Sequence, residues 1–390
     1  MIKQIINAKI VLEDRVVNGS LFIQDGKILG VNIDNCIADQ VVDANGGYVL
    51  PGFIDIHVHG GGGADFMDGS VEDFVTATNA HLGHGTTTIY PTTMSAEFSE
   101  IVNVFDVYRA AKKCEKIKIN LGGLHLEGPF ISPKMCGAQR LDLIIEPNKE
   151  IISVLEENSD IIARISCAPE VNGVYDMASA LIKKGVQFSM GHTNATYEQA
   201  EEATKKGFTS ITHMYSATSG FHKVNQKVHI GVTQAGYGID ELYPELIGDG
   251  CHVPKELLRL VTRFKGFDKV CLVTDAMRAA GTDLTESYLG KICPENRVII
   301  DDGVAKLPDK SFFAGSIGTM DRALKFAVKN AAIKVEDAIK LVSLTPAKLM
   351  KIDDKKGSIE SGKDADLVIT DNDFVVKTVF VGGNVVVNNA

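Results

Sequence analysis

The chain has 390 residues, of which 45% are hydrophobic and 23% are charged, and its formal net charge is -10. This composition is ordinary for a globular protein with a sizeable core, and the length suits one α/β barrel of about 250 residues plus a smaller domain. The acidic balance argues against a nucleic-acid binder, which would carry a basic face, although a few local cations can hold a small anion.

The chain carries no sign of secretion or membrane insertion. Residues 1–7 turn polar too soon for a signal peptide, and no apolar run reaches the ~20 residues that span a bilayer. The seven cysteines are scattered and contain no Cys-x-x-Cys pair, which argues against a disulfide framework and a structural zinc site. We therefore expect a cytoplasmic protein with no nucleic-acid partner and no membrane partner.

Both ends of the chain predict short strands. Residues 5–12, 20–24 and 27–33 alternate or are β-branched, with a turn at Asp25-Gly26. Neither end contains a periodic pattern of helix length, so we expect residues 1–50 and 353–390 to pair into one β-rich domain. Near the carboxyl end, strands are expected at 357–359, 365–370, 378–381 and 384–387.

Residues 51–352 alternate apolar runs with helical patterns. Amphipathic helices are expected at 171–184 and at 196–206, the second between the cap Thr196 and the stop Gly207, and further helices at 319–330 and 335–342. Eight such alternations favour a closed (β/α)8 barrel over an open sheet. The eight expected strands are 53–58, 86–90, 119–126, 161–167, 186–190, 209–212, 246–248 and 270–274.

Histidines and carboxylates follow most of these strands at their carboxyl ends, where barrel enzymes place catalytic groups. The chain has only ten histidines, so their gathering at one rim points to a site. In strand order, these residues are His57 and His59, His125 and Glu127, His192, His213, Asp249 and His252, and Asp275.

His57 and His59 are separated by one residue at the end of the first barrel strand. Alternation along a strand turns both imidazoles to the same face, which suits zinc, iron or a similar ion. A lone pair of this kind is more often incidental. Because a barrel core favours branched apolar residues, the further histidines at the same rim make a metal site the better interpretation.

Three other positions complete a set of nitrogen and oxygen ligands. Glu127 ends an otherwise apolar strand, where a carboxylate is costly unless it is paired or binds a metal; the alternatives are a helix N-cap or a surface residue. His192 and His213 end two neighbouring strands, although either alone could be a core histidine. Asp275 beside such a site can take the proton of an attacking water and return it to the leaving group, the alternative being a turn cap.

These segments resemble the N-acetylglucosamine-6-phosphate deacetylase family of the amidohydrolase superfamily. The motifs HLEGP at 125–129 and GHTNAT at 191–196 are quite specific to the deacetylases, whereas 344–347 and 362–367 are common to the superfamily. The matching segments occur in the family's order over most of the barrel region: 51–60, 125–130, 191–196, 212–215, 249–253, 273–276 and 314–316.

The resemblance implies a (β/α)8 TIM-type barrel with a small β-sandwich formed by both chain ends, and a homodimer. It implies one or two divalent ions per subunit, zinc or iron, with Asp275 as general base and acid. Because Glu127 occupies the relevant position, no carboxylated lysine is expected. The principal ion would be held by Glu127, His192 and His213, and a second ion would be supported by His57 and His59, which the chain keeps, with Glu127 between the two. Asp275 is also among the predicted metal-binding residues.

The resemblance also assigns residues to the sugar site, and here the chain departs from the family. The family usually has His-Leu-Tyr/Phe-Asn-Ala-Met and then an Arg, whereas residues 213–223 are HMYSATSGFHK. The Arg that would hold the sugar phosphate is therefore missing, and Lys223, Lys227 or His222 are candidates to replace it. The predicted substrate-binding residues are Ala138, Ser216, Ala217, Lys223, His252, Phe313 and Ala314.

The expected activity is hydrolysis of the acetamide of an N-acetylhexosamine 6-phosphate, foremost N-acetylglucosamine 6-phosphate, to acetate and an amino sugar phosphate in amino sugar catabolism. The sequence leaves three alternatives open. The substrate could be N-acetylgalactosamine 6-phosphate, or the chain could be another amidohydrolase, such as a cyclic amidase or an aminoacylase-like enzyme. A non-catalytic barrel scaffold would require the metal-binding cluster to be vestigial.

Overall fold

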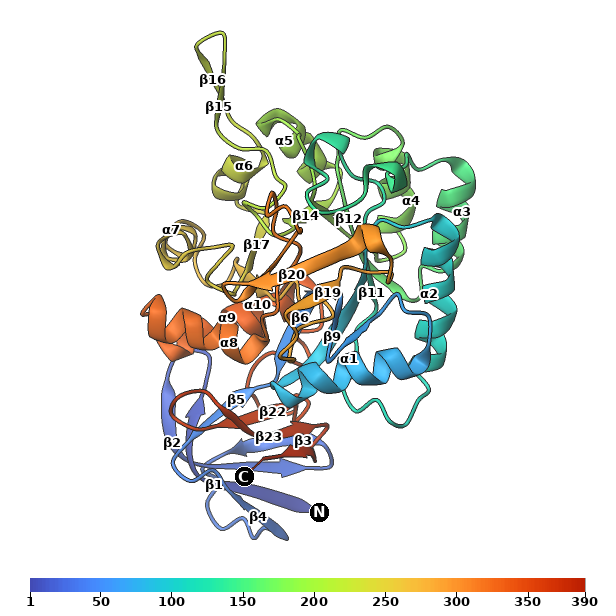
Figure 1. Cartoon of the computed structure of the whole chain (residues 1–390). Coiled ribbons are helices and arrows are strands. Elements are labelled where there is room, and N and C mark those ends of the chain that lie inside the picture. Colours follow the sequence, from blue (N-terminus) through green and yellow to red (C-terminus); the bar gives the residue numbers. More distant parts are fainter. Residues whose placement is uncertain (390) are drawn as a thin grey trace.

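The computed structural model describes residues 1–389, and its centre is a barrel of eight parallel strands (Figure 1). Each strand pairs with the next along the chain, so the predicted (β/α)8 barrel is confirmed. The strands are β6 (Phe53–Val58), β9 (Thr86–Thr93), β11 (Leu124–Glu127), β12 (Ile162–Cys167), β13 (Gln187–Met190), β14 (Phe208–Ile211), β17 (Tyr243–Ile247) and β18 (Cys271–Val273).

The barrel closes between its last strand and its first. The backbone N–H of Asp275 donates to the carbonyl of His57 at 2.9 Å, and the N–H of His59 donates to the carbonyl of Ala276 at 2.8 Å. Beneath them, the hydroxyl of Thr274 donates to the buried carboxylate of Asp55 at 2.5 Å. The closure therefore brings His57, His59 and Asp275 to the same height on the rim.

The third predicted strand is divided in the structure. Residues 119–126 were expected as one strand, but β10 (Asn120–Leu121) and β11 are separated by two glycines. Gly123 has a φ of +124°, and a Cβ at Gly122 would come within 2.4 Å of the ring of Tyr90. The chain shifts direction here because only glycine fits both the conformation and the close approach.

The helices lie around the outside of the barrel. Thr196 caps its helix as predicted, since its side chain accepts from Gln199 N–H while Gln199 accepts from Thr196 N–H. Among residues 1–389, no helix is both long and apolar enough to cross a membrane. The helices are α1 (Val71–Gly83), α2 (Phe98–Ala111), α3 (Lys149–Glu157), α4 (Val174–Ile182), α5 (Tyr197–Lys205), α6 (Val232–Gly238), α7 (Lys255–Lys265), α8 (Met320–Lys325), α9 (Val335–Val342) and α10 (Leu344–Leu349).

Several short elements lie outside the barrel sheet. The expected helix at 319–330 becomes α8 followed by a π-helical turn, Phe326–Asn330. An antiparallel hairpin of β15 (His222–Val224) and β16 (Lys227–His229) projects from the body (Figure 1). A separate antiparallel sheet contains β19 (Glu286–Tyr288), β20 (Arg297–Asp301) and β21 (Val304–Lys306). The remaining pieces are β7 (Gly60–Gly61), β8 (Ala64–Asp65) and three 3-10 turns at Pro133–Met135, Leu141–Leu143 and Pro294–Asn296.

Both ends of the chain share one sheet, at the opposite end of the molecule from the hairpin (Figure 1). The antiparallel pairing of β5 with β22 joins the two ends, and the sheet has a hydrophobic core of its own. The predicted fold class, a barrel with a small β-sandwich from both termini, is confirmed. The strands are β1 (Ile2–Val11), β2 (Val16–Gln24), β3 (Lys27–Val31), β4 (Gln40–Asp43), β5 (Tyr48–Pro51), β22 (Leu367–Thr370), β23 (Val376–Val381) and β24 (Asn384–Asn388).

One strand expected near the carboxyl end is wrong. Residues 357–359 form a loop in which Gly357 has a φ of +92°. An extended strand cannot accommodate that angle, and a Cβ at Gly357 would come within 2.8 Å of Ala347. The apolar side chain of Ile359 is buried even though it lies in a loop, and this is why the sequence pattern of residues 357–359 resembles that of a strand.

Candidate metal centre and cavity

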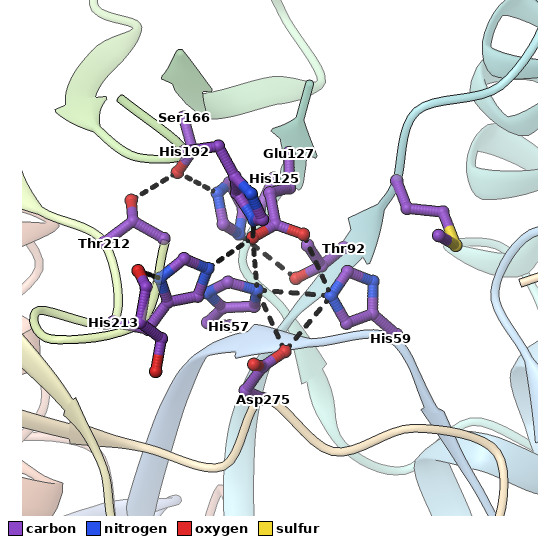
Figure 2. A network of polar contacts seen from close by, with 12 residues as sticks. His57, His59, Thr92, His125, Glu127, Ser166, His192, Thr212, His213 and Asp275 are labelled. Atoms are coloured by element: carbon purple, nitrogen blue, oxygen red, sulfur yellow. Dashed lines mark hydrogen bonds and ion pairs between the residues drawn. The ribbon is translucent and has the colours of Figure 1, made fainter. Parts of the chain in front are cut away.

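Six of the predicted site side chains converge at the carboxyl ends of the barrel strands (Figure 2). Each is at most 7% exposed. They come from five strands spread around the barrel, so their meeting depends on the closed sheet. They are His57 and His59 at β6, Glu127 at β11, His192 after β13, His213 after β14, and Asp275 after β18.

Glu127 lies in the middle of the cluster. Its Oε1 is 2.8 Å from Nε2 of His213, 3.1 Å from Nε2 of His192 and 3.4 Å from Nε2 of His57. Its Oε2 lies on the other side, 3.3 Å from Nε2 of His59. One carboxylate therefore faces both halves of the cluster, as a ligand bridging two ions would.

Asp275 faces the two histidines of β6. Its Oδ1 is 3.3 Å from Nε2 of His57 and 3.3 Å from Nε2 of His59, and those two nitrogens are 3.2 Å apart. The ligand atoms of His57, Glu127 and His213 lie within 4.8 Å of one another, as do those of His57, His59 and Asp275. In the structure, the two imidazoles of β6 point into one space, as their spacing in the sequence predicts.

The hydrogen bonds behind two imidazoles show that the cluster fits a cation. Nδ1 of His192 is 2.9 Å from the carbonyl of Met135, and Nδ1 of His213 is 3.1 Å from the carbonyl of Ser216. A carbonyl only accepts, so each Nδ1 carries a proton, and Nε2 is the nitrogen that each ring turns toward Glu127. Lone pairs facing a carboxylate repel it unless a cation or further protons lie between them. The nitrogen and oxygen donors suit a divalent transition ion.

The pKa values of the cluster follow from the close approach of its carboxylates and imidazoles. Burial alone would raise the pKa of Glu127, but the surrounding His57 and His192 hold it well below its usual range. Burial would lower the pKa of His213, yet its hydrogen bond and charge interaction with Glu127 raise it to about 9. Likewise, Asp275 and Glu127 raise the pKa of buried His59 well above its ordinary value. The carboxylates thus attract positive charge into the site.

His125 lies beside this cluster and is not one of its members. Its Nε2 is 2.7 Å from the hydroxyl of Ser166 and its Nδ1 is 3.2 Å from that of Thr92, so both nitrogens are occupied (Figure 2). Its ring packs edge-on against His57, with centroids 4.7 Å apart. Complete burial and the charge of Arg164 keep its pKa well below the usual range, so His125 is a neutral support for His57.

A cavity of about 590 Å³ opens over the cluster. Ala138, Ser216, Ala217, His252 and Phe313 line it, as do all of the predicted metal-binding residues except the fully buried His57.

Two predicted substrate-binding residues are not among the lining residues. Ala314 is fully buried between Phe313 and Gly315, which do line the cavity. Lys223 lies on the exposed β15–β16 hairpin and does not reach the cavity of its own chain. Sequence position alone could not reveal this, because the hairpin leaves the barrel surface.

Sequence reasoning missed several polar residues of the cavity, among them Gln139, Lys306 and Lys310. Gln139 accepts from Ser95 N–H at 2.9 Å, and this turns its amide to donate to Oε2 of Glu127 at 3.0 Å. Lys306 and Lys310 reach the cavity from β21 and the turn after it. Gln139 directly follows the predicted Ala138, and both lysines lie a few residues before Phe313. Their nearness in the sequence to predicted residues was the only signal that could have identified them.

The comparisons with known proteins agree with the geometry. A family model described as "Amidohydrolase family" matches residues 48–386. The chain is 34% identical to the N-acetylglucosamine-6-phosphate deacetylase of Lysinibacillus sphaericus, over 94% of this chain and 92% of that protein. It is 33% identical to the enzyme of the same name from Bacillus subtilis, over 96% and 95% of the two chains.

Solved structures of the same name are similar throughout. The crystal structure of N-acetylglucosamine-6-phosphate deacetylase from Pasteurella multocida has a TM-score of 0.92 at 30% identity and covers 100% of both chains. A mutant of the Mycobacterium smegmatis enzyme, solved in complex with N-acetyl-D-glucosamine-6-phosphate, has a TM-score of 0.88 at 26% identity and covers 100% and 99%.

Proposed function

Because the chain belongs to the amidohydrolase family, we propose that it is a metal-dependent deacetylase that hydrolyses the acetamide of N-acetylglucosamine 6-phosphate in amino sugar catabolism. The products are acetate and glucosamine 6-phosphate. The observation that carries this proposal is the meeting of six buried ligand-type side chains under a cavity of about 590 Å³. The likeness to deacetylases over nearly the whole chain supports the substrate.

Asp275 is the general base and then the general acid in this reaction. Burial would raise its pKa, but His57 and His59 lower it, so the carboxylate is ionised and ready to accept a proton. The oxygen of a water attacks the amide carbonyl carbon while Asp275 takes the proton of that water. Asp275 then returns the proton to the nitrogen as the carbon–nitrogen bond breaks, which releases the amine.

From the family resemblance, the principal ion would be held by Glu127, His192 and His213, and a second would be supported by His57 and His59, with zinc or iron as the candidates. The ligand atoms that lie within 4.8 Å of one another are those of His57, Glu127 and His213, and those of His57, His59 and Asp275. A bound ion would polarise the amide carbonyl and make the water more acidic. The chain's own contribution is to hold the imidazoles in one tautomer. The Met135 and Ser216 carbonyls do this from behind His192 and His213.

The sugar would lie between the metal cluster and the far wall of the cavity. Ala138, Ser216, Ala217 and Phe313 line this space, and the buried Ala314 directly follows Phe313 in the chain. Nδ1 of His252 donates to Asp249 at 2.7 Å, and its Nε2 has no hydrogen-bond partner among residues 1–389, which leaves it to meet the substrate. The ring packs on Phe313 with centroids 4.6 Å apart.

Acetate release tests the proposal directly. Metal-loaded protein should release acetate from N-acetylglucosamine 6-phosphate, and N-acetylgalactosamine 6-phosphate should be the poorer substrate. No release from either sugar phosphate would reject the proposal. Turnover of a dihydropyrimidine or an N-acetyl amino acid instead would assign the chain to another branch of the amidohydrolases. Elemental analysis of the same sample identifies the ion and its stoichiometry.

The sequence resemblance also leads us to propose a cytoplasmic homodimer. The hairpin supports the dimer, because exposed apolar groups at a protruding element are typical of interfaces. The exposed apolar side chains of the hairpin region are Phe221, Val224, Val228 and Ile230. Light scattering should give twice the chain mass, and cell fractionation should recover the protein from the cytoplasm.

We further propose that the chain has two domains, one made of residues 1–50 with 353–390 and the other of residues 51–352. Limited proteolysis tests this division.

A further inference from the structure

The cavity has a cationic end away from the metal cluster. Of the described residues that line it, Lys306 and Lys310 are the only lysines or arginines. A doubly charged phosphate entering this cavity needs positive charge, and the histidines of the cluster are already turned toward Glu127 and Asp275. These two lysines are therefore the cations within the cavity that are not committed to the metal cluster.

Both ammonium groups keep unused hydrogen-bond donors. Lys306 donates to Asp301 and Asp302, each at 3.1 Å, and Lys310 donates to Asp301 at 2.8 Å. An ammonium has three N–H groups, so Lys306 retains one and Lys310 retains two. The side chain of Lys306 is only 13% exposed, and its hydrogen bonds to Asp302 and Asp301 raise its pKa, so it is held in place as a cation.

The backbone orients these lysines toward the proposed sugar site. Lys306 and Phe313 form an antiparallel bridge, and Leu307 N–H donates to the carbonyl of Phe312 at 3.0 Å, which closes a tight turn carrying Lys310. Partners in an antiparallel bridge project from the same face, so Lys306 accompanies Phe313 into the cavity. Phe313 in turn packs against His252.

The paired aspartates do not block an anion. The side chain of Asp302 is 82% exposed and that of Asp301, which pairs with both lysines, is 34% exposed, so water can solvate both carboxylates when a phosphate approaches the lysines. A phosphate carries more negative charge than a carboxylate and offers three oxygens to the free N–H groups. By contrast, Lys223 and Lys227 are exposed on the hairpin and are not among the residues that line the cavity.

We propose that Lys306 and Lys310 bind the 6-phosphate of the substrate within the same chain, in place of the arginine that the sequence lacks. This inference rests on the proposed deacetylase function. It makes the β21 turn the element that selects a phosphorylated over an unphosphorylated sugar.

The test is steady-state acetate release by Lys306→Met, Lys310→Met and Lys306→Arg. With N-acetylglucosamine 6-phosphate, each Met variant should raise KM roughly tenfold or more with little change in kcat, since charge-assisted hydrogen bonds to phosphate are strong. With unphosphorylated N-acetylglucosamine, KM should be unchanged. Competitive inhibition by inorganic phosphate should weaken in the Met variants, and Lys306→Arg should retain most of it.

Controls separate this role from a general effect. Lys329→Met removes a surface cation that pairs with Asp373 away from the cavity, and it should behave as wild type. Thermal midpoint and metal content are measured for every variant. If Lys306→Met fails to fold, the exposed Lys310 decides the question, because its side chain is 59% exposed and contributes little to packing.

Three results would overturn the inference. An unchanged KM for the phosphorylated sugar in both Met variants is one, and an equal loss with the unphosphorylated sugar is another. A rise in KM in Lys223→Met but not in Lys306→Met would move phosphate binding to the hairpin. In all three cases wild-type activity is normal, whereas absence of acetate release by the wild type rejects the proposed function and the inference with it.

Discussion

Asp275 is held at the metal cluster by contacts that do not depend on its ability to take up a proton. Its Oδ1 lies 3.3 Å from Nε2 of both His57 and His59, and its backbone N–H closes the barrel on His57. Asp275→Asn preserves the size and keeps one oxygen, so fold and metal content should persist. Because the amide cannot act as a base, kcat for acetate release should fall by roughly 10²–10⁴.

The matched control for this variant is Asp354→Asn, an exposed aspartate in the turn after α10. It removes the same charge from the chain and should leave kcat unchanged. Near-native turnover by Asp275→Asn with its full metal content would remove Asp275 from the mechanism.

Gln139 holds the bridging carboxylate from outside the ligand set. Its amide donates to Oε2 of Glu127 at 3.0 Å and lies 3.3 Å from Nε2 of His192. Removing a partner that orients a metal ligand typically costs about 10–100-fold in metal affinity. We expect that loss for Gln139→Leu in a titration against a competing chelator.

The control is Ser95→Ala. Ser95 holds Gln139 through its backbone N–H, and its hydroxyl has no partner among residues 1–389, so this change should leave metal affinity unaltered. Equal affinities for Gln139→Leu and wild type would mean that Glu127 needs no such support.

These residues also show how far the sequence predicts the site. His57, His59, Glu127 and the later rim residues could be found because they end strands, and strand ends share one rim in a barrel. Gln139 and Lys306 reach the cavity through irregular loops and a small added sheet. The course of such segments has no periodicity, so the sequence could not show which side chains return to the site.

At the scale of elements, α1 carries a buried histidine that makes the fold sensitive to acid. Nε2 of His81 donates to the carbonyl of Gly60 at 2.9 Å, while Nδ1 is buried without a partner among the described residues. Burial lowers the pKa of His81 to about 4, since a second proton would meet no acceptor. The unfolded chain takes up that proton near pH 6.5, so stability falls as the pH drops from 6.5 toward 4.

His81→Gln should abolish this dependence, because glutamine can donate to Gly60 but does not titrate. In metal-free protein, the loss in unfolding free energy between pH 7 and pH 5 should be smaller in the variant by about 2 kcal/mol. Urea unfolding at both pH values measures it. Exposed His229→Gln is the control, and an unchanged acid loss in His81→Gln would contradict the assignment.

The elements themselves were predicted wherever their pattern was regular. The cap at Thr196 and the run of barrel strands follow from local chemistry and alternation. The errors lie where tertiary contacts override the local pattern. Gly122 must pass the ring of Tyr90, and Gly357 must turn beside Ala347, and in both places the chain bends within an apolar run that alternation describes as a strand.

At the scale of the molecule, the metal cluster ties the barrel together. Its side chains come from β6, β11, β13, β14 and β18, which are distributed around the closed sheet. An ion bound by them would contact both the first and the last strand across the closure. Binding to the folded state alone stabilises a protein, by about 2.7 kcal/mol at a hundred times the dissociation constant.

The stabilisation by metal should therefore grow with pH. In the metal-free protein, the pKa of His213 is raised to about 9, so the proton on His213 stabilises the fold fully below about pH 6.5 and this contribution is lost as the pH rises toward 9. An ion replaces that proton and should bind more tightly as the competing proton becomes scarce. The difference in Tm between metal-loaded and chelator-treated protein should thus be smaller at pH 6 than at pH 8. Thermal unfolding with and without chelator measures it, and a difference that shrinks with rising pH would show that protons and metal do not compete for His213.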